Sequence, residues 1–186
     1  MIEPLRYSKG REVYTAEVDL DRVGVMVIDM QDEFLKKIDP DEKEVMFAAQ
    51  IDLLDVCREY DYPALLLEYT GWGKTQKELY QSFQTVPRKA EFMKKVNNGF
   101  THPFLSFTLD MFNIETIVIA GISAPYCVKG TAEVAIEEDK KIITARQLIA
   151  SQIDRQKEFR ESLSWFSREC IYVQTYTTIT EMMKRK

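Results

Sequence analysis

The sequence predicts an α/β fold of three layers, in which helices cover both faces of a mostly parallel sheet of about six strands. Two observations support this prediction. Short, fully apolar runs recur along the chain, and longer segments with apolar residues at helical spacing lie between them. Strands that are apolar on both faces are buried on both faces, and their alternation with helices is typical of a parallel sheet.

The first predicted strand, 23–28, is rich in β-branched residues and ends at the polar Asp29. The second, 63–67, follows a predicted turn at 60–62. A further strand end is expected close to Lys94 and Lys95. Apolar runs of the same kind follow at 116–121, 141–145 and 170–173.

Helices are predicted in most of the connections. In the first of them, Val45, Ala49, Leu53 and Cys57 recur every four residues, which places them on one face of a helix. The predicted helices are 41–60, 104–112, 124–137, 154–167 and 178–186.

Length and composition predict a single domain, 1–186, since the 186 residues contain no internal repeat, low-complexity tract or linker. Residues 1–20, with Tyr7, Tyr14 and Asp19, are expected to form an N-terminal arm. Such an arm would pack along the domain or across a subunit interface, and the protein is expected to be a homo-oligomer.

The charge balance excludes several classes of partner. A formal net charge of −5 argues against nucleic acid and anionic membranes, because both require a basic face. Three well-separated cysteines without a Cys-x-x-Cys pair suggest neither a disulfide framework nor a zinc site. The polar start and the lack of a long apolar run predict no signal peptide and no membrane span. We therefore expect a cytoplasmic protein that acts on a small molecule.

Open parallel sheets bind ligands beyond the carboxyl ends of their strands. The predicted strand ends present Asp29, residues 70–72, Lys94 and residues 123–127, so an acid, a base and a thiol occur together. Cys127 follows a buried strand, a glycine-containing turn and a proline, near the start of a helix. A helix N-terminus lowers the pKa of a thiol and supplies backbone N–H groups for an oxyanion.

Each of these residues also has an ordinary explanation. A free cysteine is most often a small buried hydrophobe, and this explanation is preferred for Cys57 and Cys170. Asp29 in isolation would as readily cap the next segment, and Lys94 in isolation would be solvated surface. Only their joint placement at strand ends favours a functional site.

Three segments stand out together: VIDMQDEF (27–34), KKVNNGF (94–100) and GISAPYCVKGTA (121–132). The first is an apolar strand followed by Asp-Met-Gln, two polar residues and Phe. The second is a Lys six residues before a Phe, and the third is a Gly, a short turn, Cys-Val, two residues and Thr-Ala. Together they resemble the isochorismatase-like cysteine hydrolases, which include nicotinamidases and carbamoylsarcosine amidohydrolases.

The resemblance implies a catalytic triad of Asp29, Lys94 and Cys127. It also implies a non-proline cis peptide between Ser123 and Ala124, with the amides of Ala124 and Cys127 directed at the substrate oxygen. The chain departs from the family pattern at Pro125, which has no N–H to donate.

The metal site of nicotinamidases is not expected in this chain. Alignment on Trp72 places Gly71 and Gly73 where that family has ligands, and His102 is the single histidine. A catalytic zinc or iron site needs about three protein ligands. We therefore predict no cofactor and no metal.

The resemblance implies a metal-independent hydrolase that cleaves a small amide or ureido compound through a thioester and releases ammonia. Phe34, Trp72, Phe100 and Tyr126 are candidates for the pocket that binds this substrate, although Phe34 and Phe100 equally suit the core. One alternative is a catalytically silent or regulatory family member that binds a ligand or a partner protein. A flavodoxin-like nucleotide binder is disfavoured, because no glycine-rich phosphate motif occurs.

Overall fold

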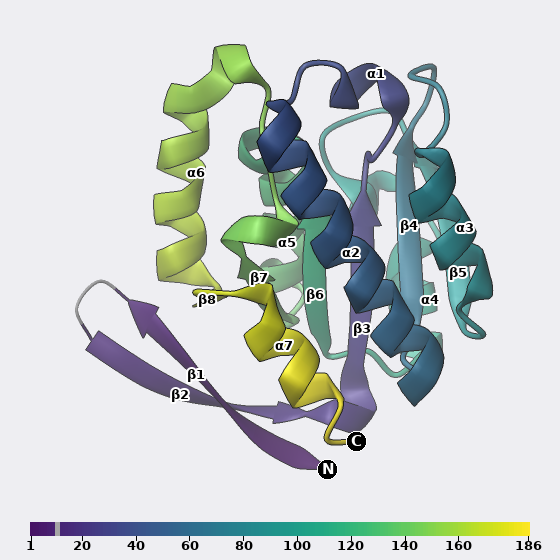
Figure 1. Cartoon of the computed structure of the whole chain (residues 1–186). Coiled ribbons are helices and arrows are strands. Elements are labelled where there is room, and N and C mark those ends of the chain that lie inside the picture. Colours follow the sequence, from purple (N-terminus) through teal and green to yellow (C-terminus); the bar gives the residue numbers. More distant parts are fainter. Residues whose placement is uncertain (10–11) are drawn as a thin grey trace.

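The computed structural model describes residues 1–9 and 12–186. Its centre is a six-stranded sheet with the strand order β5-β4-β3-β6-β7-β8 (Figure 1). Every neighbouring pair in this sheet is parallel, which confirms the predicted α/β class. The strands are β3 (Val23–Ile28), β4 (Ala64–Tyr69), β5 (Lys89–Lys94), β6 (Thr116–Gly121), β7 (Lys141–Ala145) and β8 (Ile171–Val173).

Helices cover both faces of the sheet, with α2 and α7 in front and α4 and α5 behind in Figure 1. No helix in the described part of the chain is both long and apolar enough to cross a membrane. The helices are α1 (Asp32–Leu35), α2 (Pro40–Tyr60), α3 (Lys77–Thr85), α4 (Leu105–Met111), α5 (Lys129–Glu137), α6 (Gln156–Glu169) and α7 (Tyr176–Met183).

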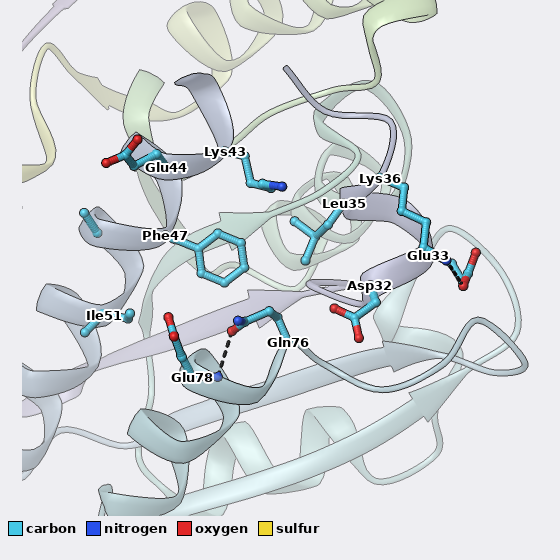
Figure 2. A pocket seen from close by; sticks show the side chains of 11 residues that line it. Asp32, Glu33, Leu35, Lys36, Lys43, Glu44, Phe47, Ile51, Gln76 and Glu78 are labelled. Carbon is cyan, nitrogen blue, oxygen red and sulfur yellow. Dashed lines mark hydrogen bonds and ion pairs between the residues drawn. The ribbon is translucent and has the colours of Figure 1, made fainter. Parts of the chain in front are cut away.

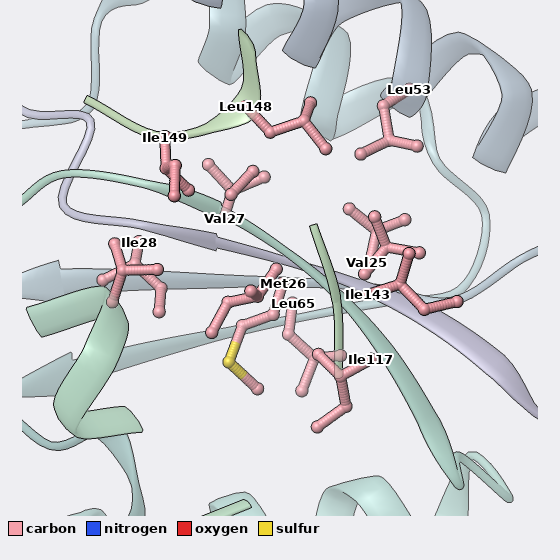
Figure 3. Close-up of a cluster of buried hydrophobic side chains, with 14 of the residues drawn as sticks. Val25, Met26, Val27, Ile28, Leu53, Leu65, Ile117, Ile143, Leu148 and Ile149 are labelled. Carbon is pink, nitrogen blue, oxygen red and sulfur yellow. The ribbon is translucent and has the colours of Figure 1, made fainter. Parts of the chain in front are cut away.

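The core lies between the central strands and these helices. Every residue of β3 and of β6 is buried, as two-sided packing of a central strand requires. In Figure 3, Val25 and Val27 point toward Leu53 of α2, whereas Met26 points to the opposite face. Burial of each such side chain stabilises the fold by about 1.5–3 kcal/mol.

Local signals explain the bounds of α2. Its N-cap, Asp39, accepts hydrogen bonds from the amides of Asp41 and Glu42, and Pro40 occupies the first turn, where its missing N–H has no cost. The helix ends at Tyr60, and its C-cap, Asp61, adopts a left-handed conformation with a φ of +55°.

Several elements differ from the sequence prediction. The expected helix 124–137 is divided into a π-helical turn, Ala124–Val128, and α5. Helix α3 and strand β5 were not individually predicted. The N-terminal segment forms an antiparallel pair, β1 (Ile2–Lys9) and β2 (Glu12–Asp19), which Figure 1 shows extending beside β8.

Candidate active site

The ends of three parallel strands place Asp29, Lys94 and Cys127 at the same edge of the sheet. Asp29 directly follows β3, Lys94 is the last residue of β5, and Cys127 lies in the π-helical turn after β6. Lys94 Nζ donates a hydrogen bond to Asp29 Oδ2 over 2.6 Å. All three residues are buried, so the charges of Asp29 and Lys94 compensate each other away from water.

Asp29 has two unusual properties. Its backbone has a φ of +53°, a left-handed conformation that is uncommon outside glycine but tolerated by Asp and Asn. Its second carboxylate oxygen, Oδ1, is buried and has no hydrogen-bond partner among residues 1–9 and 12–186. A buried acceptor without a partner costs about 1–3 kcal/mol, and such strain is concentrated at functional sites.

Lys94 is held in place from several sides. Besides Asp29, its Nζ donates to the carbonyl of Val96 over 3.3 Å. The same nitrogen lies 4.4 Å from the centre of the Tyr69 ring, which is within the range of a cation–π contact. The ammonium group therefore has one preferred position.

The surroundings of Cys127 favour the protonated form of its thiol. Burial, and then the charge of Asp29, raise its pKa to about 12, whereas Lys94 opposes the shift. Burial and the nearby carboxylate thus have a larger effect on this pKa than the helix N-terminus considered in the sequence analysis. Cys127 Sγ donates to Asn97 Oδ1 over 3.4 Å.

Asp29 has the properties of a proton acceptor for this thiol. Burial raises the pKa of Asp29, while the charge of Lys94 and the proximity of the polar groups of Cys127 and Lys94 oppose this increase. The raised pKa of Asp29 reduces the mismatch between a carboxylate and a thiol, so a proton can move between them at lower cost.

The turn before Cys127 differs from the expectation in two respects. The cis peptide joins Ile122 and Ser123, one residue earlier than the predicted Ser123–Ala124 bond. The Ala124 amide donates to the carbonyl of Ala150 over 2.8 Å, so it is not available to an oxyanion. The Ala124 amide is occupied because residue 150, which is distant in the sequence, lies beside this turn.

The remaining hydrogen bonds of the turn are internal. The amides of Tyr126 and Val128 both donate to the carbonyl of Ser123, over 3.0 and 3.2 Å, and Pro125 has no N–H. The amides of Ser123 and Cys127 are therefore the candidates for oxyanion donors in this segment.

Thr131 connects the two segments that hold Lys94 and Cys127. Its Oγ1 donates to the carbonyl of Cys127 over 2.7 Å and accepts from the amide of Gly99 over 3.0 Å. Thr131 is fully buried. We call this pair of hydrogen bonds the Thr131 bridge; it fixes the loop after β5 against the start of α5.

A cavity of about 300 Å³ opens beside the Cys127 thiol, at the lower end of the volumes usual for ligand pockets. The Phe34 and Trp72 rings are stacked 4.8 Å apart, with an angle of 15° between their planes. Helix α1 and the segments at or after the ends of β4, β5, β6 and β7 line the cavity. The lining residues are Phe34, Tyr69, Trp72, Asn97, Ser123, Tyr126, Cys127 and Gln152.

The predicted pocket residues are thus partly placed as expected. Phe34, Trp72 and Tyr126 line the cavity, but Phe100 does not. Phe100 lies in the 3₁₀ turn Gly99–Thr101 and packs against the hydrophobic core, because Asn98 accepts a hydrogen bond from its amide and fixes the turn.

Three lining residues were not predicted from the sequence: Asn97, Tyr69 and Gln152. Asn97 could have been proposed, because it lies within the segment 94–100, three residues after Lys94. Tyr69 precedes the expected strand end at 70–72. Gln152 had no signal, because its position depends on the chain returning to this edge after β7.

Gln31 positions the loop that presents Trp72. Its side chain donates to the carbonyls of Tyr69 and Gly73 over 2.9 and 2.8 Å, and its Oε1 accepts from the amide of Tyr69 over 2.6 Å. The buried side-chain carboxamide of Gln31 therefore gives a physical reason for a Gln in the Asp-Met-Gln segment.

A second, larger hollow of about 700 Å³ lies between α1, α2 and the start of α3 (Figure 2). Figure 2 shows Leu35, Phe47 and Ile51 among acidic and basic side chains. This hollow contains neither the thiol nor the Asp29–Lys94 pair, so it offers no chemistry comparable to that of the cavity beside Cys127.

The residues present do not fit the metal site of a nicotinamidase. Gly71 and Gly73, which stand at the aligned ligand positions, have no side chains. Among the described residues, no group of three or more His, Cys, Asp or Glu side chains could hold a metal ion.

Comparisons with known proteins identify the family and the fold. Residues 24–163 match the model of the isochorismatase domain. None of the curated protein sequences compared matches this chain.

Several solved structures share the fold. A ribonuclease from Caenorhabditis elegans has a TM-score of 0.74 at 17% identity, covering 91% of this chain and 84% of its own. An octameric hydrolase of unknown specificity from Escherichia coli has a TM-score of 0.75 at 19% identity, covering 91% and 82%. A nicotinamidase from Staphylococcus aureus has a TM-score of 0.70 at 19% identity, covering 83% and 99%. At these identities the likeness shows the fold alone.

Proposed function

Because the chain belongs to the isochorismatase family, we propose that it is a metal-independent cysteine hydrolase of small amide or ureido compounds. The single observation that supports this most is the buried Oδ1 of Asp29, which has no partner in the described chain. Asp29 Oδ1 can therefore accept the proton of the neighbouring Cys127 thiol. The nicotinamidase that shares the fold makes an amide the preferred substrate class.

In the proposed first step, Asp29 accepts the proton of Cys127 and the sulfur attacks the carbonyl carbon of the amide. The new C–S bond moves an electron pair onto the carbonyl oxygen. Asp29 then donates its proton to the leaving nitrogen, the C–N bond breaks, and ammonia departs. The acyl group remains on Cys127 as a thioester.

In the second step, the same carboxylate activates a water molecule, which attacks the thioester carbon. The C–S bond breaks, the carboxylic acid product leaves, and the proton returns to the sulfur through Asp29. Asp29 thus acts as base, acid, base and acid in turn, and no oxidant or cofactor is consumed.

Lys94 serves this cycle electrostatically. Its ammonium, 2.6 Å from Asp29 Oδ2, keeps the carboxylate ionised despite burial and stabilises the negative charge that passes between Asp29 and Cys127. The amides of Ser123 and Cys127 are the proposed oxyanion donors. Loss of one such donor typically reduces kcat by about 10²–10³.

The proposal extends to the surroundings of the protein. Free thiols at Cys57, Cys127 and Cys170 suit a reducing compartment such as the cytoplasm. A homo-oligomer is also proposed, with the N-terminal arm of residues 1–20 at a subunit interface. The octameric state of the hydrolase from Escherichia coli supports this.

A screen of small amides and ureido compounds for ammonia release tests the function. The native protein should release ammonia from at least one of them, and Cys127→Ala should release none. Cys170→Ala is the matched control. Cys170 is also buried, but it directly precedes β8 and so lies at the end of the sheet opposite to the strand ends that carry the site. Turnover by Cys127→Ala would overturn the mechanism, and silence of the native protein would favour a regulatory role.

A further inference from the structure

The lining of the cavity beside Cys127 is uncharged. Within the described chain, none of the residues that line it has a carboxylate, ammonium or guanidinium group. Asp29 and Lys94 lie beneath it with side chains that are 1% and 0% exposed, and they compensate each other. An ionic group on a bound substrate would therefore find no free counter-charge.

Three polar residues of this lining, Asn97, Tyr126 and Gln152, have hydrogen-bonding capacity left over within the described chain, and Gln152 is the one held by two neighbouring hydroxyls. Its Oε1 accepts from the hydroxyl of Ser123 over 3.0 Å and from that of Ser151 over 3.4 Å. The two hydroxyls are themselves 3.1 Å apart. This group of three side chains fixes the carboxamide of Gln152 in one orientation.

The other end of that carboxamide is a donor without an acceptor. None of the hydrogen bonds among residues 1–9 and 12–186 uses Gln152 Nε2, although the side chain lines the cavity. A primary amide nitrogen has two N–H donors. These N–H groups are available to an acceptor on a bound molecule.

The shape of the cavity limits what that molecule can be. Phe34 and Trp72 are stacked with an angle of 15° between their planes, and Trp72 is 41% exposed. An exposed indole face in a cavity of about 300 Å³ favours a flat group that can stack on it.

We propose that this cavity selects flat, uncharged amides with a second hydrogen-bond acceptor, and that Gln152 orients them by donating an N–H group to that acceptor. The inference rests on the proposed function in taking this cavity as the substrate site. Gln152 is then a specificity-determining residue, which contacts the substrate away from the bond that is cleaved.

Charge and hydrogen bonding make separate contributions to this selection. A buried carboxylate without a partner is penalised by several kcal/mol, which corresponds to at least about 100-fold weaker binding. One neutral hydrogen bond strengthens binding by up to about tenfold.

Binding to Cys127→Ala, which cannot turn over, measures both contributions by isothermal titration calorimetry. The probes are three benzamides of similar shape: 3-acetylbenzamide, 3-isopropylbenzamide and 3-carbamoylbenzoate. The acetyl compound should bind up to about tenfold more tightly than the isopropyl compound, and at least about 100-fold more tightly than the carboxylate.

Variants at Gln152 attribute the preference. Gln152→Met should remove the advantage of the acetyl over the isopropyl compound, and Gln152→Lys should improve carboxylate binding at least tenfold relative to the other two. Gln81→Met, an exposed glutamine on α3, should preserve all ratios. Because ratios are compared, a general loss of stability does not mimic the effect.

Equal affinity for the acetyl compound and the carboxylate, an unchanged acetyl-to-isopropyl ratio in Gln152→Met, or no binding of any probe would each overturn the inference. These outcomes are separate from the ammonia assay. A native protein that binds the probes selectively but hydrolyses no amide would refute the proposed function and leave the selectivity intact.

Discussion

Replacement of Lys94 by Met tests the buried charge pair that organises the site. Methionine is unbranched and close to lysine in length, so it fills the same space without the ammonium group. Asp29 would then be buried, with a side chain that is 1% exposed, and without its counter-charge 2.6 Å away. The packing of the fold is kept, but the negative charge of Asp29 is no longer compensated.

The expected loss of stability is large. Removal of one partner of a buried ion pair typically costs about 3–5 kcal/mol, and in a chain of this size each kcal/mol lowers Tm by about 2–4 °C. We therefore expect Lys94→Met to lower Tm by about 6–20 °C.

The loss should also depend on pH. Without Lys94 the pKa of Asp29, already raised by burial, rises further, so the folded state holds a proton that the unfolded state releases above about pH 4. More protons on the folded state mean that stability falls as pH rises from about 4 through the folded pKa.

Urea denaturation at several pH values, followed by circular dichroism, measures both effects. Lys95→Met is the matched control, because Lys95 is the exposed neighbour and surface changes are usually within about 0.5 kcal/mol. The double variant Asp29→Asn/Lys94→Met should recover part of the loss, since no charge remains buried. If Lys94→Met is as stable as Lys95→Met, the reasoning on the buried pair is refuted.

Three further predictions follow from the site. The kcat/KM of the native enzyme should fall on acidification through the pKa of Asp29, and this limb should lie above the ordinary range of aspartate because burial raises that pKa; a flat profile down to pH 4 would contradict it. Alkylation of Cys127 by iodoacetamide, followed by peptide mass spectrometry, should accelerate through pH 9, since the thiol pKa is raised to about 12; a plateau below pH 8 would instead indicate a resting thiolate. Gln31→Leu removes three hydrogen bonds of the Trp72 loop and should lower the free energy of unfolding by about 2–4 kcal/mol, with Gln84→Leu on the exposed face of α3 as control.

The central sheet was predictable because its signal is local. Strands 23–28 and 116–121 have the predicted bounds, since each is a continuous apolar run buried on both faces. Their parallel arrangement brings Asp29 and Cys127 to one edge of the sheet, whereas the choice of Lys94, at the end of β5, depended on the family resemblance.

Elements without an apolar run were harder to predict. Strand β5 lies at the edge of the sheet and alternates buried with exposed residues toward its end, so no apolar run marks it. In the pair β1 and β2, residues 12–15 of β2 are exposed. Edge strands need little burial, and their sequence resembles that of a loop.

The details of the site depend on contacts between distant segments. The Ala124 amide is bound to residue 150, and Gln152 reaches the cavity through Ser123 and Ser151. No spacing within the segment 121–132 encodes such partners, so the sequence could not predict that the Ala124 amide is occupied.

The Thr131 bridge has a consequence for altering this protein. It joins the backbone of Cys127 to the loop after β5, and Thr131 itself is not part of the lining of the cavity. Side chains such as Tyr126 and Gln152 can therefore be exchanged to admit new substrates while the reacting groups keep their spacing. Redesign of specificity in this fold should start from the lining and leave the threonine hydroxyl untouched.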